Sequence, residues 1–123
     1  MNLGQIRSDL ADALRDVVAS VAQNRGAMID GFPAAMIDVD TITPDTMDDT
    51  YQVDCTVRVM VSKADNPDGW QRLDDLLSDD TIGEALRASD VVHTVGAYDN
   101  IGADIEYDDG IALGFTIAVA VLA

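Results

Sequence analysis

The segment from residue 50 to residue 62 alternates strictly between apolar and polar side chains, and this pattern constrains the fold more than any other feature. The apolar positions are Tyr51, Val53, Cys55, Val57, Val59 and Val61, and the positions between them are Gln52, Asp54, Thr56, Arg58, Met60 and Ser62. A period of two with many β-branched residues predicts an antiparallel strand with one buried face. The chain must therefore contain a sheet whose apolar face is covered.

The length of this segment sets a further limit. A strand of about 13 residues reaches about 43 Å at roughly 3.3 Å per residue. A compact domain of 123 residues has a radius of gyration of about 14 Å and is about 35 Å across. Either the strand bends or bulges within the sheet, or its hairpin projects from the domain. A projecting arm would suit contact with a neighbouring subunit.

The last apolar run also alternates, between a large face and a small face. The large face carries Ile111, Leu113, Phe115, Ile117, Val119 and Val121, and the small face carries Ala112, Gly114, Thr116, Ala118 and Ala120. Apolar character on both faces predicts a central strand over 111–122. The small face would let a helix approach closely, and the first helix is the expected partner. The run is shorter than the roughly 20 residues that a membrane helix needs.

Other segments show helical spacing or turn residues. Apolar residues at steps of three and four predict a first helix from about Asn2 to Ala22, and Asn24-Arg25-Gly26 ends it. Two shorter helices are predicted around Trp70–Leu77 and Ile82–Leu86, the second capped by Asp80 or Thr81. Short strands are predicted at 34–39 and 91–97, an acidic loop at 40–49, a partly alternating segment at 98–109, and a tight turn at 108–110.

Together these elements predict a single α+β domain over residues 1–123. Its mainly antiparallel sheet has four or more strands, packed by the N-terminal helix and two short helices in the order α-β-β-α-α-β-β. The length fits one domain, and the sequence shows no internal repeat or linker.

The chain is strongly acidic, with 23 acidic residues against seven lysines and arginines and a net charge of −16. A charge of this size repels nucleic-acid phosphates and anionic membranes, so neither is an expected ligand. Simple solvation of the surface, or adaptation to a salt-rich host, would explain the same composition. Cys55 is the single cysteine, and residues 1–9 lack the apolar stretch of a signal peptide. These features predict synthesis in a reducing cytoplasm.

Catalytic motifs are not found. His93 is the single histidine, and no Gly-x-Ser-x-Gly elbow accompanies it. Cys55 is expected to pack as a small apolar residue. The aspartates at positions 38, 40, 45, 48 and 49 could gather calcium, but they lack the spacing of a calcium-binding loop. We therefore expect no enzyme activity, no cofactor and no metal.

Six segments in this order form a larger pattern. They are Leu3–Val21, Phe32-Pro33-Ala34-Ala35-Met36-Ile37, Tyr51–Val61, Gly69–Leu77, Thr81–Leu86 and Gly110–Phe115. The pattern resembles the tail terminator proteins of long-tailed (siphovirus-type) bacteriophages, especially those that infect actinobacteria. The resemblance implies a virion neck protein that forms a ring, usually a hexamer. The ring would cap the tail tube, end its polymerisation and join it to the head connector.

The resemblance also implies that DNA passes through the ring without specific binding. The residues expected in an acidic lumen or arm loop are Asp38, Asp40, Asp45, Asp48 and Asp49, and those expected to contact a subunit or partner are Arg58, Met60 and Trp70. Core packing is the alternative for Trp70. The alternatives for the whole chain are another head–tail connector, head-closure or tail-completion protein, an unrelated binding module, and an enzyme dependent on His93 or an aspartate.

Overall fold

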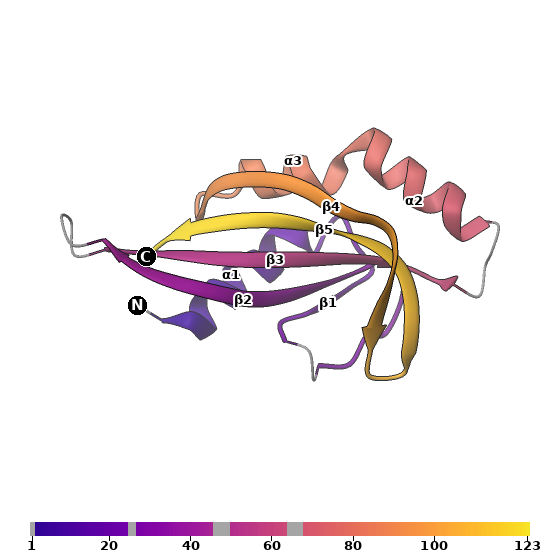
Figure 1. The fold of residues 1–123 in the computed structure, drawn as a ribbon, viewed down its shortest axis with the longest axis horizontal. Coiled ribbons are helices and arrows are strands. Elements are labelled where there is room, and N and C mark those ends of the chain that lie inside the picture. The colour runs from indigo at the N-terminus through magenta and orange to yellow at the C-terminus, as the bar shows by residue number, and fades with distance from the viewer. Residues whose placement is uncertain (1, 25–26, 46–49, 64–67) are drawn as a thin grey trace.

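A computed structural model describes residues 2–24, 27–45, 50–63 and 68–123, which form a five-stranded mixed sheet with three helices (Figure 1). The elements in chain order are α1 (Leu3–Leu14), β1 (Ser20–Ala22), β2 (Ala34–Asp45), β3 (Thr50–Val61), α2 (Asp68–Asp79), α3 (Thr81–Ala88), β4 (Val92–Tyr107) and β5 (Gly110–Leu122). The predicted α+β class is confirmed, and the predicted order holds apart from the additional strand β1.

The two strands with the clearest alternation lie side by side at the centre of the sheet. β3 pairs antiparallel with β5, with Val53 opposite Val121 and Val59 opposite Phe115. The sheet order is β1-β2-β3-β5-β4, and β1 alone runs parallel to its neighbour. The strands predicted at 50–62 and 111–122 are therefore confirmed within a residue or two at their ends.

The larger core lies between the sheet and the three helices. The helices contribute Ile6, Leu10 and Leu14 from α1, Leu73 from α2, and Ile82 and Leu86 from α3. The sheet contributes the large face of β5, including Phe115 and Ile117, and the valines of β3. The prediction that α1 packs on the small face of β5 is wrong. The branched and aromatic side chains of the large face bury more apolar area than alanines do, and burial contributes about 25 cal/mol per Å².

The small face of β5 instead allows the sheet to bend. A second core cluster forms on this face from Ala22, Ala34, Met36, Met60, Ile105 and Ala112. A side chain at Gly114 would overlap the carbonyl oxygen of Val59 and the side chain of Ile105. Glycine at this position therefore lets the ribbon of β4 and β5 turn out of the sheet, as Figure 1 shows at the end opposite the chain termini.

The first helix is shorter than predicted. It ends at Leu14, not at Ala22, and Ser20–Ala22 forms β1 against residues Ala34–Met36 of β2. The backbone amide of Ala19 donates a hydrogen bond of 2.8 Å to the carbonyl of Pro33 and fixes the start of this pairing. Helical spacing continues through Val17, Val18 and Val21. The backbone groups at the start of β2 nevertheless need hydrogen-bond partners, and Ser20–Ala22 supplies them as a strand.

The second strand is longer than predicted, because β2 continues to Asp45 through Pro44. β1 covers only Ala34–Met36, so the rest of β2 is an edge, where proline is tolerated. A bulge lies between Val39 and Thr41, and the outer end of the β2–β3 hairpin is exposed. Figure 1 shows this end projecting beyond the helices. The hairpin that contains the strand predicted at 50–62 therefore projects, and the bulge lies in its partner β2.

The predicted strand at 91–97 and the partly alternating segment after it form one strand, β4. Its pairing with β5 shifts register three times, and Asn100 and Gly102 have positive φ values of 55° and 81°. The tight turn at Asp108–Asp109 that leads into β5 is confirmed. None of the helices among the described residues is long and apolar enough to cross a membrane.

Candidate functional site

The acidic residues predicted to share one surface have different environments and different hydrogen-bond partners. Asp38 is buried on the face of the sheet away from the helices, where the Arg58 Nε donates to its Oδ2 at 2.5 Å. Asp38 and Arg58 are diagonal cross-strand neighbours on β2 and β3, because Asp38 lies opposite Thr56, two residues from Arg58. The charge of Asp38 is therefore neutralised within the chain, and its place in a lumen stays a prediction. Arg58 is correspondingly engaged with Asp38.

The remaining predicted acids lie toward the hairpin end. Asp40 is exposed at the bulge of β2 and accepts a hydrogen bond from the hydroxyl of Thr56. Asp48, Asp49 and the side chain of Asp45 lie outside the described residues. Of the five acids, Asp40 is thus the one whose described position fits an exposed acidic surface.

Met60 and Trp70, both predicted to contact a partner, differ in their exposure to solvent. Met60 is fully buried in the second core cluster, so the expectation that it contacts a partner is wrong. Trp70 is 46% exposed, and its ring lies against Gly102 of β4. It therefore joins α2 to β4 while leaving part of its indole accessible.

The candidate catalytic residues do not assemble into a site. Burial, helped by the negative charges of Asp40 and Asp54, raises the pKa of the Cys55 thiol to about 11. The thiol is therefore protonated near neutral pH, which disfavours a nucleophilic role. His93 is exposed on β4. Within the described ranges, no three histidine, cysteine or acidic side chains are placed to hold a metal ion.

One polar cluster links the helices to the sheet. The hydroxyl of Tyr98 donates to Asp80 Oδ1 at 2.5 Å and accepts from Arg87 Nη2 at 3.0 Å, while Arg87 Nη1 donates to Asp80 Oδ2 at 2.9 Å. The hydrogen bond from Tyr98, followed by the effect of Arg87, lowers the pKa of Asp80. Burial and the carboxylate of Asp80 raise the pKa of Tyr98. Because each group is satisfied by the other two, the cluster fixes the α2–α3 junction and leaves little capacity for a ligand.

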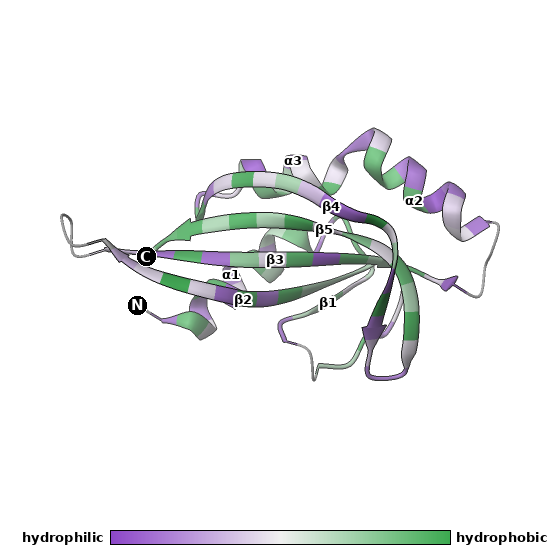
Figure 2. Cartoon of the chain, in the orientation of Figure 1, coloured by the Kyte–Doolittle hydropathy of each residue, from purple (hydrophilic) through white to green (hydrophobic). Residues whose placement is uncertain are grey.

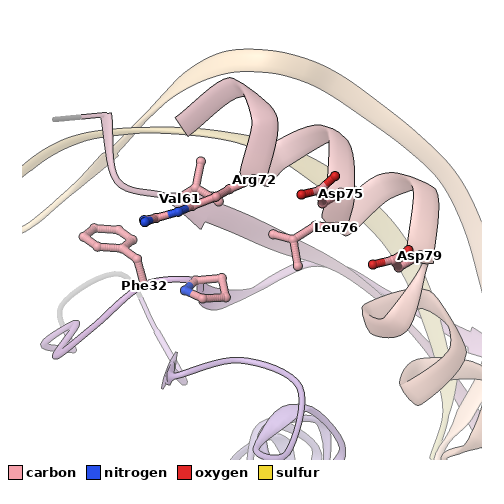
Figure 3. Close-up of a pocket in the computed structure, with 7 residues that line it drawn as sticks. Phe32, Val61, Arg72, Asp75, Leu76 and Asp79 are labelled. Atoms are coloured by element: carbon pink, nitrogen blue, oxygen red, sulfur yellow. The ribbon is translucent and has the colours of Figure 1, made fainter. Parts of the chain in front are cut away.

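A concave surface lies between α2 and the turn at Phe32–Pro33 that leads into β2 (Figure 3). It holds about 200 Å³ and is lined by Phe32, Pro33, Val61, Arg72, Asp75, Leu76 and Asp79. We call it the α2 groove. Phe32 is held at one side by an edge-to-face contact with Tyr107, with ring centroids 5.8 Å apart.

The amphipathic character of α2 creates this groove. Leu73 points into the core, whereas Leu76 is half-buried and reaches the groove. Figure 2 shows apolar and hydrophilic bands alternating along α2. Asp75 and Asp79 lie one helical turn apart and are both exposed. The groove thus combines an apolar floor with the charged groups of Arg72, Asp75 and Asp79 on its rim.

The sequence pattern alone did not indicate this site. The spacing of Arg72, Asp75 and Asp79 at steps of three and four places them on one helix face. This spacing can be read from the sequence, but the position of Phe32–Pro33 opposite this helix face depends on the fold. Comparison of the chain with protein-family models gives no match, and comparison with curated proteins gives none.

Proposed function

We propose that the protein is a structural component of a phage neck: a ring of six copies that caps the tail tube and joins the tail to the head connector. The support is twofold. The order of helices and strands retains the order on which the resemblance to tail terminator proteins rests. The sheet also has two outer edges through which copies can pair.

The sheet edges are the observation that carries this proposal. β1 covers only the first three residues of β2, and no strand among the described residues pairs with the outer side of β4. β2, β3, β5 and β4 alternate in direction, so β2 and β4 run oppositely. When the β4 edge of one copy meets the β2 edge of the next, the new pair is antiparallel, which is the more stable arrangement.

Such a contact is head-to-tail, and a head-to-tail contact closes into a ring when its rotation permits. The bulges of β4 and the bulge and proline of β2 make both edges irregular. Irregular edges suppress indiscriminate pairing. The acidic surface, with Asp40 among its exposed members, would repel DNA phosphates and let DNA pass without binding.

Electron microscopy of the purified protein, alone and mixed with isolated tail tubes, tests the proposal. We expect rings in solution or caps on tube ends. Ile42→Lys places a charge on the free edge of β2 and should reduce the fraction of rings or caps at least about fivefold. Gln71→Lys adds the same charge on exposed α2, within reach of Asp75, and should leave assembly unchanged.

Absence of rings and caps under both conditions would refute the proposal. Binding to isolated head portals with no binding to tube ends would instead identify a head-closure protein of the same neck, which is the alternative. Equal loss of assembly in both variants would show that the β2 edge is not the contact.

A further inference from the structure

We propose that the α2 groove binds a segment of a partner protein in which a large apolar side chain stands next to a lysine or arginine. The apolar side chain would contact Pro33, Val61 and Leu76, and the basic group would lie beside Asp75 and Asp79 (Figure 3). This interaction surface is separate from the sheet edges and does not require that the protein form a ring.

The size of the groove favours a single side chain as the buried anchor. Its volume of about 200 Å³ is below the roughly 300–1,000 Å³ of clefts that enclose small-molecule ligands. A large apolar side chain in a pocket with a desolvated floor is the usual centre of a protein–protein contact. The groove is therefore suited to a protruding side chain of another polypeptide.

The charges on the rim specify what should accompany that side chain. Asp75 Oδ1 accepts a hydrogen bond of 2.9 Å from Gln71, and no described residue donates to Asp79. Figure 3 shows Arg72 extending toward Phe32, away from the end of the groove where Asp79 lies. Two carboxylates at one end favour an ammonium or guanidinium group there, because charge-assisted hydrogen bonds are the stronger ones.

A second copy of the chain is a poor occupant. The basic group that the rim calls for is scarce on this chain, which has seven lysines and arginines against 23 acidic residues. Within the part of the chain that the structure describes, Arg15, Arg58, Lys63 and Arg87 pair with aspartates of the same chain, and Arg72 is also engaged. Charge complementarity therefore selects a different protein with a basic segment.

Nuclear magnetic resonance with defined peptides tests this inference. A capped leucyl-lysyl-lysine peptide should shift the methyl signals of Val61 and Leu76 in a saturable manner. Replacement of its lysines by glutamates, or of its leucine by alanine, should each weaken binding at least about fivefold. Absence of shifts at Val61 and Leu76 up to millimolar peptide, or equal binding of the lysine and glutamate peptides, would overturn the inference.

Matched variants assign the effect to the groove. Asp75→Asn combined with Asp79→Asn should weaken the lysine peptide about fivefold or more. Asp74→Asn combined with Asp109→Asn changes the net charge equally at exposed positions outside the groove and should leave affinity within twofold. Equal weakening in both double variants would show a diffuse charge effect and refute a specific site. Urea unfolding of each variant verifies that the fold is retained.

Discussion

At the scale of single residues, Tyr98 links the sheet to the junction of α2 and α3, and no motif in the sequence predicts this link. Its ring stacks on Phe115 of the core with centroids 6.1 Å apart, and its hydroxyl bonds both Asp80 and Arg87. The sequence predicted Asp80 or Thr81 as a helix cap, and Asp80 occupies the cap position of α3. Its side chain makes no cap hydrogen bond and reaches Tyr98 instead. Spacing along the chain could not predict this, because 18 residues separate the two.

The variant Tyr98→Phe should lower the free energy of unfolding by about 1–2 kcal/mol at pH 7. It retains the stacked ring but removes a hydroxyl that bonds to a charged carboxylate. Urea unfolding followed by circular dichroism measures the change. Tyr51→Phe, at an exposed tyrosine on the outer part of β3, is the control and should change stability by less than about 0.5 kcal/mol.

The loss caused by Tyr98→Phe should depend on pH. The pKa of Asp80 is lowered from 3.8, so its stabilising contribution is present above pH 3.8 and disappears as the pH falls through the lowered value. The difference between wild type and Tyr98→Phe should therefore shrink below pH 3.8. A difference that grows under acid conditions would contradict the role assigned to the charged carboxylate.

At the scale of helices and strands, the sequence predicted the elements with long periodic patterns. It missed the features that form only when two distant segments of the chain come together. β3 and β5 were predicted because their alternation persists over many residues. β1 was missed because Ser20–Ala22 is too short for a period and is a strand only beside Ala34–Met36. The α2 groove was missed for the same reason: its two sides are joined by the sheet and not by the chain between them.

The contact between α2 and β4 depends on a glycine. Gly102 has φ of +81°, and a Cβ there would lie 2.6 Å from the Trp70 Cη2 atom. Gly102→Ala should therefore displace Trp70 and lower the free energy of unfolding by about 1–3 kcal/mol. Because Trp70 is the only tryptophan, its fluorescence emission should shift to longer wavelength.

Gly4→Ala provides a control for the loss of a glycine. Gly4 lies in α1 with φ outside the positive region, so alanine there should maintain stability or raise it by up to about 1 kcal/mol. Its emission spectrum should match that of the wild type. An unchanged spectrum in Gly102→Ala would show that Trp70 is not positioned by the absence of a side chain at residue 102.

At the scale of the whole molecule, the excess of carboxylates opposes folding. The net charge is −16, and exposed pairs such as Arg15–Asp12 offset little of it. Composition alone predicted this feature, since self-repulsion depends on net charge and not on topology. It could not predict that Asp38 is neutralised by Arg58 across two strands.

Screening of these charges should stabilise the fold. The urea midpoint should rise as sodium chloride is increased from about 0.05 to about 0.3 M, a range in which the screening length falls below about 10 Å. Equilibrium unfolding at fixed pH measures it. A midpoint that falls with salt would mean that attractive ion pairs outweigh repulsion.

Where the sheet bends near Gly114, the same strands contribute residues to both core clusters. The larger core and the second cluster lie on opposite faces of the same strands: Ile37 and Met36 are consecutive in β2, and Met60 and Val61 are consecutive in β3. Unfolding of either cluster would require β2 and β3 to separate, and their separation would also disrupt the other cluster. The two halves of the interior should consequently melt together, so that heating or denaturant produces one cooperative transition.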